Sequence, residues 1–198
     1  FVGPDRNAYF WDETLQTARK LTESSDVLGA YVSPEGSFVA LTRVSSVFDY
    51  SLDLIQSDGL NQRTVLSADA FNALPHPENT IGNAPSQVYW IPNSRKLAFS
   101  TRITFEGPGM ANGDGLYILD TENGNLGKLL TVADTWAWSF SFSPDGEKIA
   151  ISKPESLDIY HADGSLYSKS LISFNFVNTA SEYAWTPDPV WSPDSSSI

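Results

Sequence analysis

Short continuous apolar runs recur along the chain, and each one follows a turn sequence with proline at its centre. Three of these runs are Val39–Leu41, Leu97–Phe99 and Ile149–Ile151, and each has an alanine in the middle. An apolar run without polar alternation is typical of a strand that is buried on both faces. The small alanine suits a position where neighbouring sheets lie close together. The pattern therefore predicts a series of similar sheets stacked against one another.

The turn sequence is present four times without gaps. Its prolines are spaced 58, 52 and 49 residues apart along the chain; they are Pro34, Pro92, Pro144 and Pro193. Proline presets φ at the first central position of a tight turn, and the Asp, Asn or Gly residues that follow it also favour a turn. Each copy therefore predicts a hairpin between two strands, which we call A and B. The spacing is somewhat longer than the roughly 40–50 residues of common propeller repeats, so the excess is expected in loops.

A second hairpin follows each of the first three copies. Its turns lie at Asp58–Gly59, Asn123–Gly124 and Asp163–Gly164. Asp-Gly and Asn-Gly pairs between apolar strands are strong hairpin signals. With these strands, C and D, each repeat is a four-stranded antiparallel meander, which is the blade of a β-propeller.

We therefore predict an all-β fold, a β-propeller built from four-stranded antiparallel blades. The expected segments are a half blade at 1–24, whole blades at about 26–67, 86–131 and 135–172, and a half blade at 183–198. Three whole blades and two complementary halves fit either a fragment of a larger propeller or a four-bladed ring closed by strands from both termini. We expect the fragment, because Ile198 stops within a strand.

Charge and composition narrow the class of partner. The 198 residues include 24 acidic and 12 basic side chains, and the formal net charge is −12. Such a field repels a phosphate backbone, so no nucleic-acid partner is expected. No stretch approaches the roughly 18 apolar residues of a membrane helix, so no membrane span is expected in this segment. The absence of cysteine excludes disulfides, thiolate metal sites and a cysteine nucleophile, and the chain starts at Phe1, so any targeting signal is expected outside it.

The turn motif also carries a family resemblance. Phe142–Gly146 and Trp191–Asp194 closely match an apolar-Ser-Pro-Asp-Gly turn, while Val32–Gly36 and Trp90–Asn93 are degenerate copies. Followed by an apolar-Ala-apolar strand, this turn resembles the repeat of the TolB-like (Pro-Asp repeat) β-propeller family, over nearly the whole chain. The resemblance implies a bacterial extracytoplasmic protein, periplasmic or secreted, that binds other proteins through the propeller face or funnel. Similar propellers also cap the catalytic domain of prolyl-oligopeptidase relatives.

The meander assigns every connection to one of two faces. The A-to-B and C-to-D turns lie on one face, here called the short-turn face, because all of them are short. The B-to-C and D-to-A connections lie on the other, the long-connection face. All three long segments, Ser67–Pro85, Thr101–Gly115 and Ser173–Ser181, belong to the second set and are predicted to be loops. Loops on a rigid scaffold usually carry binding, so this face is expected to hold the site.

Candidate partner-binding residues follow from this face and from residue chemistry. Basic side chains recur where strand B ends and could ring the funnel mouth, or could offset nearby carboxylates. Aromatic side chains near strand A could anchor a partner, or could pack between blades. Asn112 and Asp114 could help to ligate calcium, but turn chemistry fits their spacing better. The candidates are Arg43, His76, Arg102, Phe105, Glu106, Met110, Asn112, Asp114, Tyr183 and Trp185.

Catalysis has little support in the sequence. The two histidines, His76 and His161, are expected on opposite faces and so cannot share a metal ion. The Gly-x-Ser-x-Gly and His-Glu-x-x-His motifs are absent. We therefore expect a non-enzymatic scaffold, without a cofactor or metal, that binds a protein or peptide partner through the long-connection face. The alternatives are the propeller domain of a larger prolyl-oligopeptidase-like hydrolase and a carbohydrate-binding propeller, and the oligomeric state is left open.

Overall fold

The first three proline-centred turns each close a hairpin between two strands, as their residue types favour. Across the first turn the Ser33 amide donates to the Phe38 carbonyl at 2.8 Å, and across the third the Ser143 amide donates to Lys148 at 2.9 Å. Gly36 and Gly146 take positive φ values of 74° and 79° at the matching position. Glycine has no Cβ to oppose this left-handed conformation, so it is well suited to that place in the turn.

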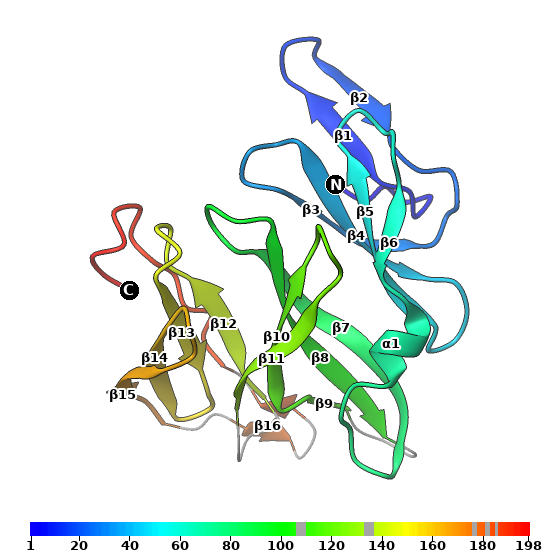
Figure 1. Cartoon of the computed structure of the whole chain (residues 1–198). Coiled ribbons are helices and arrows are strands. Elements are labelled where there is room, and N and C mark those ends of the chain that lie inside the picture. Colours follow the sequence, from blue (N-terminus) through cyan, green and yellow to red (C-terminus); the bar gives the residue numbers. More distant parts are fainter. Residues whose placement is uncertain (106–109, 133–136, 176–177, 181–182, 185) are drawn as a thin grey trace.

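The computed structural model describes residues 1–105, 110–132, 137–175, 178–180, 183–184 and 186–198. These residues form three four-stranded antiparallel blades in a row, with a hairpin before them and one after (Figure 1). No helix in these ranges is long and apolar enough to span a membrane.

The three blades have the expected strand order. Blade 1 consists of β3 (Val27–Val32), β4 (Phe38–Val44), β5 (Tyr50–Gln56) and β6 (Arg63–Leu66). Blade 2 consists of β7 (Thr80–Trp90), β8 (Lys96–Phe105), β10 (Gly115–Asp120) and β11 (Leu126–Thr131), and β9 (Met110–Asn112) pairs with β8. Blade 3 consists of β12 (Ser139–Phe142), β13 (Lys148–Ser152), β14 (Ser156–His161) and β15 (Leu166–Ser173).

The apolar-Ala-apolar runs fill the spaces between blades. Ala40, Ala98 and Ala150 are all fully buried, and each lies in the apolar cluster that its blade shares with the segment that follows. The flanking residues of each run face the other way: Leu97 and Phe99, for example, belong to the cluster between blades 1 and 2. Successive side chains of a strand point to opposite faces. Both faces of every B strand are therefore covered, which confirms the stacked-sheet prediction.

The two ends of the chain are shorter pieces packed on the outer blades. At the start, β1 (Tyr9–Asp12) pairs with β2 (Thr17–Lys20), and Ala8 and Leu21 pack against blade 1. At the end, β16 (Asn178–Ala180) pairs with β17 (Tyr183–Ala184). The segment 186–198 contains no assigned strand but lies along blade 3, where the Trp191 indole donates to the Ser141 carbonyl at 3.3 Å.

All three predicted long loops are partly regular structure. The predicted loop 173–181 is wrong for 178–180, which form β16. The predicted loop 101–115 is wrong for 101–105, which continue β8, and for 110–112, which form β9. The predicted loop 67–85 contains the helix α1 (Ala68–Asn72) and the first residues of β7. β-branched and aromatic side chains such as Thr101, Ile103 and Phe105 favour an extended strand. The Ser67 hydroxyl caps α1 by accepting from the Ala70 amide, and Phe71 anchors the helix in the core.

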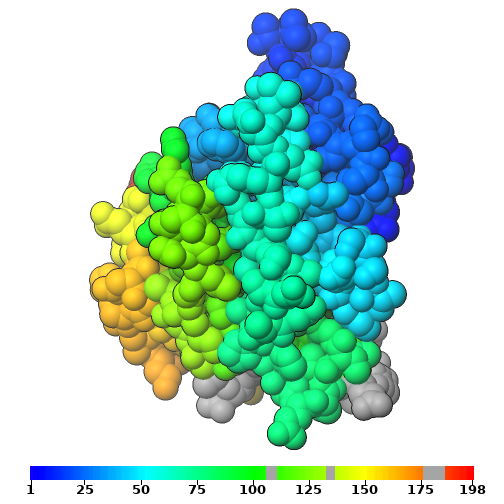
Figure 2. All heavy atoms as spheres, turned by 45° about the vertical axis from the view of Figure 1, so that its right-hand side comes forward, coloured from blue at the N-terminus to red at the C-terminus, as the bar shows by residue number. Residues whose placement is uncertain are grey.

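These extensions enlarge one end of the molecule. Figure 1 shows the A-to-B and C-to-D turns of blades 2 and 3 pointing to the upper end, while α1, β9 and β16 lie in the lower half. The segment that carries α1 and the connection after it forms the protruding lower end of the surface in Figure 2. The connections of the long-connection face therefore protrude from the molecule at blade 2.

Candidate binding site

A groove of about 400 Å³ opens on the long-connection face of blade 2. It brings together four of the candidate residues from the sequence, His76, Phe105, Asn112 and Asp114. They come from two separate connections: the segment after α1 and the β8–β9 hairpin with the residues that follow it. The remaining lining is apolar and consists of Pro75, Pro77, Ile103 and Ala111.

The first wall is held in place from below by α1. The Phe71 ring is fully buried and stacks on the Phe99 ring of β8, with 5.7 Å between the ring centroids. After the helix, the Thr80 amide donates to the Pro77 carbonyl at 3.1 Å and closes the connection into β7. His76 is exposed, and its Nδ1 lies 3.0 Å from the Pro77 carbonyl oxygen. Prolines on both sides restrict the backbone of His76.

The second wall is the extension of β8 with β9. Ile103 lies opposite Ala111 in this pairing. The residues after β9 are fixed by blade 3, because the Trp138 indole donates to the Gly113 carbonyl at 2.8 Å. Trp138 is 2% exposed, so it packs and positions this wall. The side chain of Asn112 donates to the Trp138 carbonyl, and the contact is thus reciprocal.

Charge at the groove is limited to its rim. Asp114 is half exposed and pairs with Lys128, with 3.0 Å between Oδ1 and Nζ. Among the described residues, no group of three or more histidine or carboxylate side chains is placed to hold a metal ion. An apolar groove with a carboxylate at its mouth suits a ligand that has an apolar group attached to a hydrogen-bond donor or a cation.

Solved structures show which fold this is. A scan of protein-family models finds no match, and a search of curated protein sequences finds none. An oligogalacturonate lyase in complex with manganese matches at a TM-score of 0.59 and 18% identity, over 93% of this chain and 47% of that one. TolB from Acinetobacter baumannii matches at 0.53 and 17% identity, over 84% of this chain and 38% of that one. The propeller domain of the Trilobed protease from Pyrococcus furiosus, described as having an open velcro topology, matches at 0.52 and 16% identity, over 84% and 48%.

The chain has a TolB-like β-propeller fold. At this level of identity the likeness concerns the fold alone. The chain spans less than half the length of these three matched structures.

In this TolB-like propeller, two of the basic side chains at the ends of B strands are ion-paired inside their own blades. Arg43 pairs with Asp53 and Asp26, at 2.6 and 2.7 Å. Lys153 pairs with Asp158 at 2.6 Å. Burial alone would raise the pKa of Asp26 and of Asp158, but the hydrogen bonds that they accept outweigh burial and lower both pKa values. Arg43 and Lys153 thus offset nearby carboxylates, which is one of the two roles that the sequence left open.

The remaining candidates are dispersed. Counted from the turn proline, Arg102 is one position further along its B strand than Arg43. Its side chain therefore points to the other face of the strand, where it is exposed. Met110 lies opposite Thr104 in β9, and Tyr183 begins β17. Glu106 and Trp185 lie outside the described residues. His161 ends β14 at the C-to-D turn of blade 3, whereas His76 lies in the D-to-A connection between blades 1 and 2.

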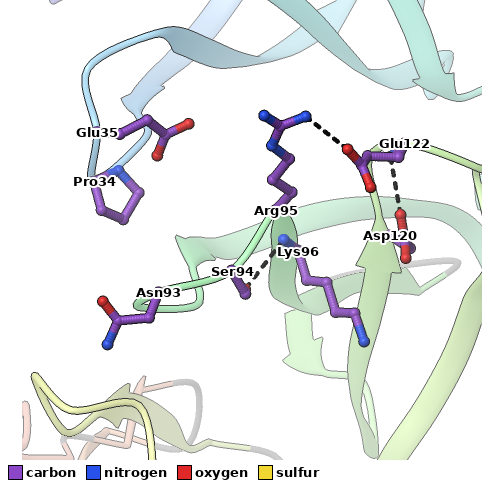
Figure 3. Close-up of a pocket in the computed structure, with 8 residues that line it drawn as sticks. All are labelled: Pro34, Glu35, Asn93, Ser94, Arg95, Lys96, Asp120 and Glu122. Carbon is purple, nitrogen blue, oxygen red and sulfur yellow. Dashed lines mark hydrogen bonds and ion pairs between the residues drawn. The ribbon is translucent and has the colours of Figure 1, made fainter.

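Hollows at the short-turn face were not anticipated. Figure 3 shows one of about 580 Å³ between the turns of blades 1 and 2, with Glu35 facing Arg95 across it. Arg95 pairs with Glu122 at 2.6 Å, and both side chains are more than half exposed. A larger hollow, of about 670 Å³, lies between blades 2 and 3. The lengths of the turns on this face did not predict these hollows, because the hollows lie between the short turns of adjacent blades.

Proposed function

We propose that this propeller is a non-enzymatic scaffold that binds a peptide segment of a partner protein in the groove on its long-connection face. The observation that carries the proposal is the convergence of two connections, distant in the sequence, on one apolar groove with a carboxylate at its mouth. The net charge of −12 favours a partner segment with basic residues. An extracytoplasmic location is part of the proposal and rests on the TolB-like resemblance.

Peptide display tests the proposal directly. A random peptide library is selected on the immobilised protein, and enriched peptides are measured by calorimetry on the wild type and on Phe105→Ala. We expect enriched peptides to carry an apolar residue next to Lys or Arg, and Phe105→Ala to weaken them at least about tenfold because the groove loses its aromatic wall. The control is Tyr167→Ala, which removes an aromatic side chain that is 59% exposed on blade 3. A lack of enriched peptides, or equal affinity for the wild type and Phe105→Ala, would overturn the proposal.

A propeller domain of a larger hydrolase is the second candidate. The observation that favours it is the likeness to the propeller domain of a protease, of which this chain covers 48%. Peptidase assays on the full-length gene product distinguish the two candidates, because a scaffold has no turnover on any peptide that binds the groove. A carbohydrate-binding propeller is the third hypothesis. It would be supported if the protein bound glycans on an array and bound no peptide.

A further inference from the structure

A second, smaller hollow adjoins the groove at His76. It measures about 150 Å³ and lies between the β4–β5 connection and the start of β7. Phe48 lines it from the first of these segments, and Thr80 and Asn83 line it from the second. His76 lines both the hollow and the groove. The two spaces therefore adjoin at the exposed His76 side chain.

Asn83 has an unused carboxamide at this hollow. The residue is 2% exposed, and neither its Nδ2 nor its Oδ1 has a hydrogen-bond partner among the described residues. The Thr80 hydroxyl is also buried and unpaired within the same part of the chain. Buried polar groups in folded proteins are nearly always hydrogen-bonded, and an unmatched one is costly. Two such groups at one small hollow are therefore available to hydrogen-bond with a polar ligand.

The hollow is shaped by a strained aromatic residue. Phe48 has a φ of 63°, which is unusual for a bulky side chain, and its ring lies against the backbone of β7. Gly82 makes this approach possible, because a Cβ there would lie 2.1 Å from Phe48 Cδ1. Strain at a non-glycine residue is maintained where the surrounding structure enforces it, and such residues cluster at ligand sites.

We propose that the Asn83 carboxamide binds the N–H and C=O of one residue of an extended peptide, whose adjacent side chain occupies the apolar groove. A carboxamide presents a donor and an acceptor side by side. In an extended peptide the N–H and C=O of a single residue point to the same side, as they do in a sheet, so one residue satisfies both Asn83 atoms. This inference rests on the proposed function and specifies how the peptide is recognised.

The acetamido group of an N-acetylated sugar offers the same two atoms in a different arrangement. Its trans amide directs the N–H and C=O in opposite directions, so it satisfies one Asn83 atom at a time. The adjoining groove is lined by prolines, Ile103 and Phe105, which suit an apolar side chain better than sugar hydroxyls. The geometry therefore favours the peptide, and N-acetylglucosamine serves as the comparison.

The test uses N-acetyl-leucine methylamide, its analogue methylated at the leucine nitrogen, and N-acetylglucosamine. The wild-type protein, labelled with ¹⁵N, is titrated with each probe while the Asn83 side-chain NH₂ resonances are followed. We expect the unmodified probe to shift these resonances and to bind at least about tenfold more tightly than the N-methylated analogue, which lacks the donor. Unchanged Asn83 resonances at saturation, equal affinity of the two leucine probes, or stronger binding of the sugar would overturn the inference.

Two variants complete the design. Asn83→Leu retains the size but removes donor and acceptor, and we expect it to bind both leucine probes equally and weakly. The matched control, Asn125→Leu, changes an exposed asparagine near the short-turn face and should bind as the wild type does. The N-methyl comparison on the wild type stands even where Asn83→Leu fails to fold. If Phe105→Ala abolishes peptide binding while N-methylation has no effect, the proposed function stands and this inference fails; if no peptide binds at all, both fail.

Discussion

Blade 2 differs from blades 1 and 3 at one pair of equivalent positions in strands B and C. In blade 1 Leu41 lies opposite Asp53, and in blade 3 Ile151 lies opposite Asp158. Both carboxylates are ion-paired with a basic residue at the end of strand B. In blade 2 Phe99 lies opposite Tyr117, and the two rings stack with 5.4 Å between their centroids.

The blade with the aromatic pair is also the one that carries the groove. Where blades 1 and 3 have Arg43 and Lys153, blade 2 has Thr101. The B strands of the outer blades end at or next to their basic residue, whereas β8 continues for four residues beyond Thr101. The extended β8 pairs with β9 and forms one wall of the groove. At this position the outer blades thus have a charge pair, whereas the central blade has aromatic packing and a longer B strand.

The largest expected effect comes from breaking the aromatic side of this comparison. Tyr117→Ala removes a ring that is 3% exposed and packed against Phe99, and we expect the free energy of unfolding to fall by about 3–5 kcal/mol. Urea denaturation followed by circular dichroism measures the change. Tyr117→Phe is the control and retains the stacking, so it should cost less than about 1.5 kcal/mol. Similar losses in the two variants would contradict the packing role.

The charged side of the comparison is tested by Arg43→Met. This change leaves the Asp53 side chain, which is 4% exposed, without its cation. We expect a loss of about 3 kcal/mol in the free energy of unfolding, since an unpaired buried charge is strongly destabilising. Arg102→Met is the matched control, because Arg102 is exposed, and it should change stability by no more than about 0.5 kcal/mol. A loss in Arg102→Met as large as that in Arg43→Met would show that burial of the pair is not the cause.

Much of this comparison was visible in the sequence, but the reason for the groove was not. The proline turns and the apolar-Ala-apolar runs predicted the blades because both signals are local. The face assignment was enough to group His76, Phe105, Asn112 and Asp114, which belong to two different connections. The extension of β8 was missed although Ile103 and Phe105 favour a strand, because the segment was interpreted by its length rather than by its residues.

The smaller hollow that adjoins the groove at His76 could not be inferred from the sequence. Nothing in the residues around Asn83 indicates that its carboxamide is buried and unpaired. The hollow beside it is lined in part by Phe48, which is 35 positions earlier in the chain and belongs to another blade. The helix α1 was missed for a similar reason, since its five residues are too few to show periodicity and its position depends on the burial of Phe71.

A smaller effect is expected where blade 1 meets the long-connection face of blade 2. Gly82→Ala places a Cβ against the Phe48 ring, and we expect a loss of about 1–3 kcal/mol in the free energy of unfolding, typical of overpacking. Gly127→Ala, in β11, meets no atom within 4 Å and should be neutral or stabilising by up to about 1 kcal/mol. Thermal melts of both variants check the contrast. Equal melting temperatures would mean that the approach of Phe48 to β7 is not required by the fold.

The smallest effect is the pH dependence of the outer blades. The pKa of Asp158 is lowered in the folded protein, because hydrogen bonds from Lys153 and the Ser170 amide outweigh the opposing effect of burial. A carboxylate with a lowered folded pKa stabilises the protein above the pKa of the unfolded state, about 3.9, and loses that contribution as the pH falls through the folded value. We therefore expect Asp158→Asn to be less stable than the wild type at pH 7, and the difference to shrink steadily below about pH 4. Urea denaturation of both proteins between pH 7 and pH 2.5 measures this difference in stability.

The Tyr117→Phe variant of blade 2 provides the contrast. Burial, with Asp114 nearby, raises the pKa of Tyr117 to about 12, so this residue does not titrate in the acid range. The variant should therefore differ from the wild type by the same free energy of unfolding at every pH tested.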